Sequence, residues 1–223
     1  MRNKIISMLC IVCLTMMLTA CSVSGSATTS ARTVVPSSLE NIPSSKNTKV
    51  VVEKGDSYYD PQSLEEVENL SEFIVKGHLL DDARQKLYSP ESGVVVYGVT
   101  VSSLEISKVY KGKLNAGETI PIAEKYYTLD ENGETTRYEL GYAPSNPGTE
   151  YIFFLNKAID SNEFMRGFYS PMVKETGRYP VLRTKDSGYS RLNLMSENEL
   201  NLVQENPETY KRIYQQVIDK YLQ

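Results

Sequence analysis

The sequence predicts a mainly β domain followed by a C-terminal helix, and we expect the strands to form a small barrel. The most informative segment runs from Val94 to Tyr110. Alternate apolar residues line one face up to Val101, and the pattern then moves to the opposite face at Leu104. A change of phase in a period-two pattern marks a β-bulge or a corner, which we place at Ser102-Ser103, and long bent strands of this kind close small barrels.

The end of the chain provides the second observation, an amphipathic helix. Ser196 to Glu199 has the pattern of a capping box, and Asn206-Pro207-Glu208 offers a cap, a first-turn proline and an acid that suits a helix N-terminus. We expect the apolar stripe that follows to pack on the barrel, with a groove in a partner protein as the alternative. The stripe consists of Tyr210, Ile213, Tyr214, Val217, Ile218, Tyr221 and Leu222.

The remaining elements follow from shorter signals. A capping box at Ser63-Leu64-Glu65-Glu66 predicts a short helix over Leu64 to Leu70, directly before the strands. Pro121 lies between Ile120 and Ile122 and cannot donate to a ladder, so it marks an edge or a bulge. Further strands are expected at Glu72 to Leu80, Tyr151 to Leu155, Phe164 to Val173 and Arg178 to Arg183.

The first residues have the layout of an export signal. A short basic stretch precedes Ile5 to Ala20, which contains no charged residue. As a helix this run would measure about 24 Å, less than the ~30 Å hydrocarbon core, so we favour a cleaved signal over a transmembrane helix. It ends in Leu18-Thr19-Ala20-Cys21, which resembles the lipobox of bacterial lipoproteins. The resemblance implies cleavage before Cys21, a diacylglyceryl group on its thiol and a fatty acyl group on its amine.

The sequence is therefore expected to have four parts. Residues 1–20 form the signal, and residues 21–58 form the lipidated cysteine and a flexible tether rich in Ser and Thr. Residues 59–193 form the barrel domain, and residues 194–223 form the helical segment. Within the tether, Lys49 to Val52 is a candidate first strand. The anchor predicts a location on the extracytoplasmic face of the cell membrane.

The composition excludes several chemistries. Cys10 and Cys13 leave with the signal and Cys21 is lipidated, so the domain has no thiol for disulfides, zinc sites or nucleophilic catalysis. The one histidine, His78, is expected to be a half-exposed strand residue, and no glycine-rich phosphate loop is present. We expect no metal and no cofactor.

The balance of charge bears on the partners. Removing Arg2 and Lys4 from the 24 basic residues leaves 22 against 28 acidic ones, a net charge of −6. A negative domain disfavours nucleic acid as a partner, because the phosphate backbone repels it. The lipid anchor makes the membrane itself one partner, and we expect an envelope protein or a carbohydrate to be the other.

Three phrases in the strand region resemble the repeating frame of netrin-like or TIMP-like modules, which have the OB-fold and also occur in bacterial lipoproteins. They cover residues 72 to 155 and imply an OB-like barrel. Animal members are stapled by disulfides, and this domain has no cysteine to match. The inhibitory zinc chelation of the metalloproteinase inhibitors does not carry over, because the N-terminal cysteine here is expected to be lipidated. The phrases are Ile74-Val75-Lys76-Gly77, Val109-Tyr110-Lys111-Gly112 with Gly117-Glu118-Thr119-Ile120, and Gly148-Thr149-Glu150-Tyr151-Ile152.

The leading hypothesis for function is a non-catalytic binding or scaffold module, since OB barrels bind ligands through a strand face and its flanking loops. An enzyme is the alternative and would depend on a carboxylate pair, for which Asp81-Asp82 is the only adjacent aspartate doublet. A structural subunit of an envelope complex, docked through the C-terminal helix, is the third hypothesis.

The candidate binding surface lies on Lys125 to Pro147, inserted between two barrel strands. Asn132-Gly133 predicts a two-residue hairpin turn that would pair Tyr127 with Tyr138. A hairpin this short has little apolar material to bury its tyrosine rings, so we expect some of them to stay exposed and to offer a contact surface. The alternative is that the rings cover the open end of the barrel. The rings in question are those of Tyr126, Tyr127, Tyr138 and Tyr142.

Overall fold

A computed structural model describes one compact unit within Val34–Gln223. The export signal and Cys21 lie outside the described residues, as do Asn132 and Asn206 of the predicted turn and cap. Within the described ranges, no helix is both long and apolar enough to cross a membrane. The described residues are 39–43, 48–53, 59–90, 93–131, 133–172, 174–181, 192, 194–200, 202–203 and 207–222.

Five strands close into a barrel, which confirms the predicted fold class. Each pairs with two neighbours in the ring β5-β3-β9-β10-β6, and β6 pairs with β5 to complete it. The β6 and β10 strands are parallel, and all other neighbours are antiparallel. This is a closed Greek-key barrel of the OB type. The strands are β3 (Phe73–Leu79), β5 (Tyr97–Lys111), β6 (Thr119–Glu124), β9 (Glu150–Lys157) and β10 (Tyr169–Pro171).

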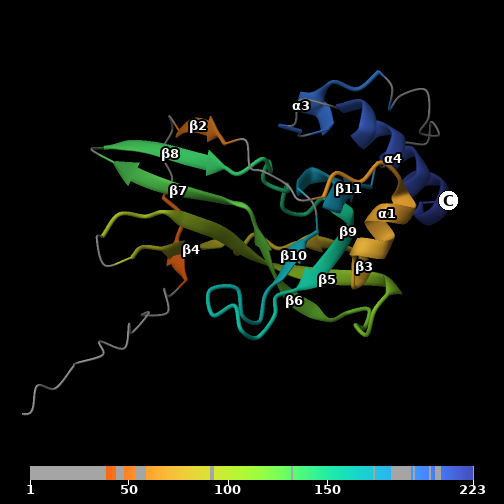
Figure 1. Cartoon of the computed structure of the whole chain (residues 1–223), viewed down its shortest axis with the longest axis horizontal. Helices are drawn as coiled ribbons and strands as arrows, with labels where there is room; N and C mark the ends of the chain where they lie inside the picture. The colour runs from red at the N-terminus through yellow and green to blue at the C-terminus, as the bar shows by residue number, and fades with distance from the viewer. Residues whose placement is uncertain are drawn as a thin grey trace, which may run out of the picture. The chain divides into compact units, whose positions relative to one another are not determined.

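Outside the barrel lie a second sheet and two strands, β1 and β4, that continue the barrel sheet beyond β5. The second sheet has the order β2-β8-β7 and is drawn apart from the helices in Figure 1. It joins β2 (Thr48–Val52), β8 (Glu134–Glu139) and β7 (Tyr126–Glu131). The short β1 (Glu40–Asn41) pairs with β4 (Arg84–Tyr88), which in turn pairs with β5.

The first two strands correct the predicted domain boundary. Both lie inside the range expected to be tether, so the boundary at residue 59 is wrong. The β-branched run Val50 to Val52 favours an extended backbone, and β2 finds a partner in β8, where Val51 lies beside Tyr138 in parallel register. The candidate strand at Lys49 to Val52 is confirmed.

The helices cover one outer face of the barrel. The first, α1 (Leu64–Leu70), has the predicted bounds, and the Ser63 hydroxyl accepts the predicted capping bond from the Glu66 amide at 3.3 Å. A capping box also begins α3 (Glu197–Leu200), and α4 (Pro207–Tyr221) starts at the predicted proline. The stripe of α4 is buried against α1 and the outer face of β3 and β9, which confirms that it packs on the barrel. A 3₁₀ turn, Lys174–Gly177, leads into β11 (Arg178–Pro180), which pairs with β9.

The change of phase in β5 has a different cause from the one expected. Pairing of β5 with β6 is regular from Thr100 to Glu105, so no bulge lies at Ser102-Ser103. The register shifts occur further along, where β3 pairs with the second half of β5. Leu104 and Ile106 face the barrel interior, whereas Val99 and Val101 belong to a separate cluster on the outer face. The shift in pattern therefore marks an outer face that is itself covered.

The segment that covers this face was predicted to be a strand. Only Tyr169–Pro171 of the predicted strand Phe164 to Val173 is extended, and Val173 lies outside the described residues. Residues 161–167 form turns, and Gly167 has a φ of 85°, a conformation that a glycine adopts without strain. The chain thus forms a loop between β9 and β10.

Candidate functional site

The tyrosine hairpin forms as expected in its register. Tyr127 pairs with Tyr138, and the two rings stack with centroids 5.1 Å apart and planes at 16°. Glu131 pairs with Glu134, which leaves a two-residue turn in which Gly133 has a φ of 82°. These contacts confirm the predicted cross-strand pair.

The same hairpin does not provide the expected surface of exposed rings. Tyr126 is 8% exposed, Tyr127 is 6% exposed and Tyr142 is 1% exposed, and only Tyr138 is partly exposed. Of the four rings, only that of Tyr138 is left to contribute to an exposed contact surface.

The reason is that the hairpin packs on β4 and β5. A Cβ added at Gly98 would lie 2.7 Å from the Cβ of Tyr127, so this glycine leaves room for the ring. The Thr100 hydroxyl donates to the Tyr126 carbonyl at 2.8 Å, and the Thr128 amide donates to Gln85 Oε1 at 3.0 Å. The rings are buried by strands far away in the sequence, which the sequence pattern did not reveal.

A buried polar cluster lies close to the hairpin. Glu124 of β6 is 1% exposed, and its Oε1 accepts from the Ser145 hydroxyl at 2.5 Å and from the Ser145 amide at 3.2 Å. The Arg178 guanidinium of β11 donates to the Ala143 carbonyl at 2.6 Å and lies 4.7 Å from the centre of the Tyr142 ring. Burial raises the pKa of Glu124, and the Arg178 charge offsets this only in part.

This cluster connects β6, the segment before β9, and the C-terminal part of the chain. The Tyr210 hydroxyl of α4 donates to the Arg178 carbonyl at 3.0 Å. Both charged side chains are enclosed, which suits an internal anchor better than a site open to substrate. The alternation along β6 is a sequence signal for the buried position of Glu124. Ile120, Ile122 and Glu124 share the parity of the interior face, and this places a carboxylate inside the barrel.

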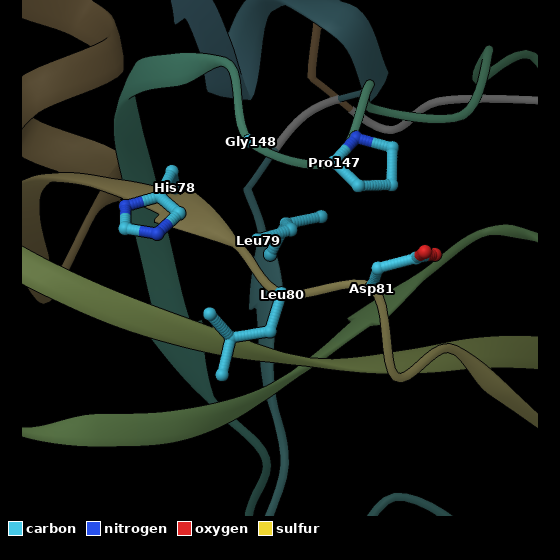
Figure 2. A pocket seen from close by; sticks show the side chains of 6 residues that line it. All are labelled: His78, Leu79, Leu80, Asp81, Pro147 and Gly148. Carbon is cyan, nitrogen blue, oxygen red and sulfur yellow. The ribbon is translucent and has the colours of Figure 1, made fainter.

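A surface groove contains two of the residues considered for catalysis. It has a volume of about 440 Å³ and is lined by His78, Leu79, Leu80, Asp81, Pro147 and Gly148. Figure 2 shows the imidazole of His78 and the carboxylate of Asp81 on opposite sides, with both leucines between them. His78 is partly exposed in β3, as expected. The groove therefore does not pair an acid with a base.

The aspartate doublet is divided between two environments. Asp81 lines the groove. Asp82 Oδ1 instead accepts a hydrogen bond from the Ser103 amide at 2.9 Å, which connects the loop that follows β3 with strand β5. Across the residues that the structure describes, no three His, Cys, Asp or Glu side chains are grouped so that they could hold a metal ion. The doublet is thus not arranged as a shared site for two carboxylates.

The outer face of β5 and β6 is an apolar surface that is covered by a loop. Val99, Val101 and Ala123 form its floor and are at most 6% exposed. Loop 158–168, which connects β9 with β10, places Phe164, Met165 and Phe168 over this floor. In OB-folds the corresponding strand face and its flanking loops bind ligands. We call this surface the covered face.

One lysine lies beside the floor of the covered face, on β4, where it pairs with Val99 of β5. Lys86 of β4 is 9% exposed, and its ammonium donates to the Phe164 carbonyl at 2.8 Å. The same ammonium is 5.1 Å from the ring centre of Phe164 and 5.4 Å from that of Phe168. No carboxylate in the described part of the chain forms an ion pair with it. Burial lowers the pKa of Lys86.

Two tyrosines extend the covered face at its edge. Tyr88 contacts the ring of Phe164 edge-on, with centroids 6.1 Å apart, and Tyr97 contacts the same ring at 5.1 Å. The sequence analysis missed this site because it assigned the two phenylalanines to a strand. The available signal was the group of Phe164, Met165 and Phe168 around Gly167, since large apolar side chains in a loop need a surface to pack on.

No protein-family model matches the chain, and a comparison with curated proteins finds none that matches it. The resemblance to netrin-like modules therefore remains a prediction from sequence phrases. The barrel itself is observed, but a fold of this type carries many functions. The function has to be argued from the residues.

Proposed function

We propose that the protein is a lipoprotein anchored on the extracytoplasmic face of the cell membrane, and that its domain is a non-catalytic binding module of the envelope. The observation that carries the proposal is Cys21, which directly follows Thr19-Ala20 at the end of an uncharged run of export-signal length. Two or three acyl chains, each contributing about 0.8 kcal/mol per buried CH₂, would hold the domain stably at the membrane.

The position of β1 limits how far the domain can lie from its anchor. Nineteen chain steps separate Cys21 from Glu40, the first residue of β1. Even a fully extended chain of this length spans at most about 65 Å. The ligand of such a module is therefore expected near the membrane surface, where envelope proteins and carbohydrates are the available partners.

The arrangement of ionisable groups supports binding over catalysis. Glu124 and Arg178 are enclosed, and the His78 and Asp81 side chains point apart across an open groove. A general acid and a general base that act together must both lie within reach of the reacting atoms of one substrate. The covered face, by contrast, collects apolar and aromatic side chains around one ammonium, which is a composition suited to recognition.

The two other hypotheses lack a favouring observation. A carboxylate-dependent enzyme would need Asp81 and Asp82 at one site, and Asp82 is engaged with the Ser103 amide. A structural subunit docked through α4 would need a free apolar stripe, and the buried residues of α4 contact their own domain. Such a subunit would have to use another surface.

Metabolic labelling with a clickable fatty acid tests the anchor. The wild-type chain should incorporate label and sediment with membranes, and Cys21→Ala should lose both properties. Cys13→Ala is the matched control, because this cysteine lies inside the signal and should not affect labelling. Undiminished label on Cys21→Ala would contradict the proposal. A pull-down of the anchored protein from its own envelope, analysed by mass spectrometry, then identifies the partner.

A further inference from the structure

The loop over the covered face is closed on itself. The Ala158 amide donates to the Phe168 carbonyl at 2.9 Å and joins the two ends of the loop. Inside it, the Asn162 amide donates to the Ile159 carbonyl, and Arg166 Nε donates to the Asp160 carbonyl at 2.9 Å. A surface loop with joined ends and its own internal bonds is an Ω-loop, a type that is often functional.

Few interactions tie this loop to the barrel. Among the described residues, one hydrogen bond crosses from loop 158–168 to the rest of the domain outside the β9–β10 ladder, and it is the bond from Lys86 to the Phe164 carbonyl. The other contacts are apolar or aromatic. Phe164, Met165 and Phe168 pack on the floor, and their neighbours at its edge are the rings of Tyr88 and Tyr97 and the Lys86 ammonium. The three loop side chains are only partly buried, and Ile159, next to the closed end of the loop, is 70% exposed. The loop can therefore lift as a unit without breaking a strand pairing.

Lifting the loop would uncover a defined set of groups. Val99, Val101 and Ala123 would meet water, and the Lys86 ammonium would lose its carbonyl acceptor and both ring faces. A ligand that takes the place of the loop has to restore both kinds of contact. It needs large apolar groups for the floor and an oxygen acceptor with aromatic rings for the ammonium.

We propose that the covered face is the binding face of the module, that its ligand is a peptide segment of a partner protein with two aromatic side chains and a carbonyl for Lys86, and that loop 158–168 occupies this face until the partner displaces it. The inference rests on the proposed binding function and names its ligand class. A peptide is favoured because the present occupant is one. Phe164 and Phe168 supply the rings, and the backbone of Phe164 supplies the acceptor.

Thiol labelling of the floor tests whether the loop opens. The full chain with Cys10→Ser, Cys13→Ser and Cys21→Ser, purified in detergent, carries a single added cysteine at Ala123, which is 0% exposed in the covered face. The matched control places the cysteine at Val75, which is 0% exposed inside the barrel. We expect Ala123→Cys to react at least about tenfold faster than Val75→Cys under native conditions. We also expect Lys86→Met to raise the rate at Ala123→Cys further, without changing the rate at Val75→Cys. Equal rates at the two sites would overturn the proposal.

A peptide of the loop sequence, residues 160–169, tests the ligand class. Fluorescence anisotropy should show that it binds the Phe164→Ser/Phe168→Ser variant at least about tenfold more tightly than the wild type, whose own loop fills the face. A peptide with both phenylalanines replaced by serine is the control and should not bind. Binding of the two peptides with equal affinity would exclude an aromatic peptide site. If the double variant fails to fold, the single-cysteine chain with the native loop decides. Excess loop peptide should raise its Ala123→Cys labelling rate, and an unchanged rate would count against the proposal.

These outcomes are separate from the test of the anchor. The thiol measurements use chains without Cys21, and the peptide measurements compare two chains with the same N-terminus, so neither set depends on lipidation. Fatty-acid label at Cys21 together with equal thiol rates would leave an anchored lipoprotein without a peptide face. Rapid labelling at Ala123→Cys, together with no fatty-acid label on the wild-type chain that keeps Cys21, would leave the face intact and overturn the anchor.

Discussion

The outer face of β3 and β9 and the outer face of β5 and β6 are both apolar, yet the chain covers them with different material. The first face is covered by α1 and α4, which Figure 1 shows beside the barrel. The buried cluster there includes Ile74, Ile152 and Phe154. On the second face, one loop covers a floor built around Val99 and Val101. Both faces belong to the same barrel, so a difference in local stability between them comes from the helices on one side and the loop on the other.

Hydrogen bonds sharpen this contrast. The helical cover consists of α1 and α4, and hydrogen bonds join α4 both to α1 and to β11, the strand that pairs with β9. Tyr210 donates to the Arg178 carbonyl, Tyr214 donates to the Pro180 carbonyl, and the Leu64 amide donates to Gln216 Oε1 at 2.8 Å. In the described part of the chain, the loop cover is joined to the rest of the domain by the one bond from Lys86. We infer that the helical cover stabilises the domain and that the loop cover can open to expose the covered face.

The largest effect is expected from a substitution in the helical cover. Ile213 of α4 is fully buried, so Ile213→Ala removes apolar contacts and leaves a cavity. We expect it to lower the free energy of unfolding by about 2–5 kcal/mol. Urea denaturation followed by circular dichroism measures this change. A loss of less than about 1 kcal/mol would mean that the helix does not hold the barrel.

A substitution in the loop cover should cost less. Phe164 is only partly buried, so Phe164→Ala gives up part of the ~1.5–3 kcal/mol that full burial of a large apolar side chain provides. We expect a loss of about 1 kcal/mol in the same denaturation experiment. A cost equal to that of Ile213→Ala would remove the distinction between the two covers.

The buried carboxylate adds a dependence on pH. Burial raises the pKa of Glu124 in the folded protein above its ordinary value of 4.5. A raised pKa means that the folded state binds the proton more tightly, so this contribution to stability is complete below about pH 4.5 and is lost as the pH rises through the raised value. Glu124→Gln stays neutral at every pH. The difference in unfolding free energy between wild type and variant should therefore change in favour of the variant as the pH rises from 4.5, and a constant difference would refute this.

The smallest effect is expected at the surface of the helical cover. Lys220 of α4 contacts Glu68 of α1 at 2.7 Å, but the lysine side chain is 54% exposed. Exposed ion pairs contribute little because water and salt screen them. Lys220→Met should lower the free energy of unfolding by less than about 1 kcal/mol at low salt, and the effect should shrink in high salt. A salt-independent loss would show that packing of the lysine stem dominates.

The elements that could be predicted from sequence are those with local signals. The capping boxes at Ser63 and Ser196 gave the starts of two helices, and the period of the C-terminal stripe gave the buried face of α4. The register of Tyr127 with Tyr138 followed from the Asn-Gly pair that closes the turn. In each case the deciding residues are close together in the chain.

The covers could not be predicted because they depend on contacts between distant residues. Tyr127 is buried by β5 because Gly98 leaves room for its ring, and nothing near Tyr127 in the sequence indicates this. Phe164 packs on Val99 and on Lys86, more than sixty residues earlier in the chain. The change of phase in β5 did signal a second buried face, but the sequence pattern could not tell a covering loop from a bend in the strand.

Native-state proteolysis tests the difference between the two covers most directly. Arg166 in the loop and Arg212 in α4 are both exposed, so trypsin can reach either side chain, but cleavage requires the backbone around it to open. We expect cleavage after Arg166 at a rate that is independent of low urea concentrations, because the loop opens locally, and cleavage after Arg212 only at the rate of global unfolding. Mass spectrometry of the fragments identifies the sites. Cleavage after Arg212 at a rate equal to or faster than that after Arg166 would contradict the assignment of a stabilising helical cover and an opening loop cover.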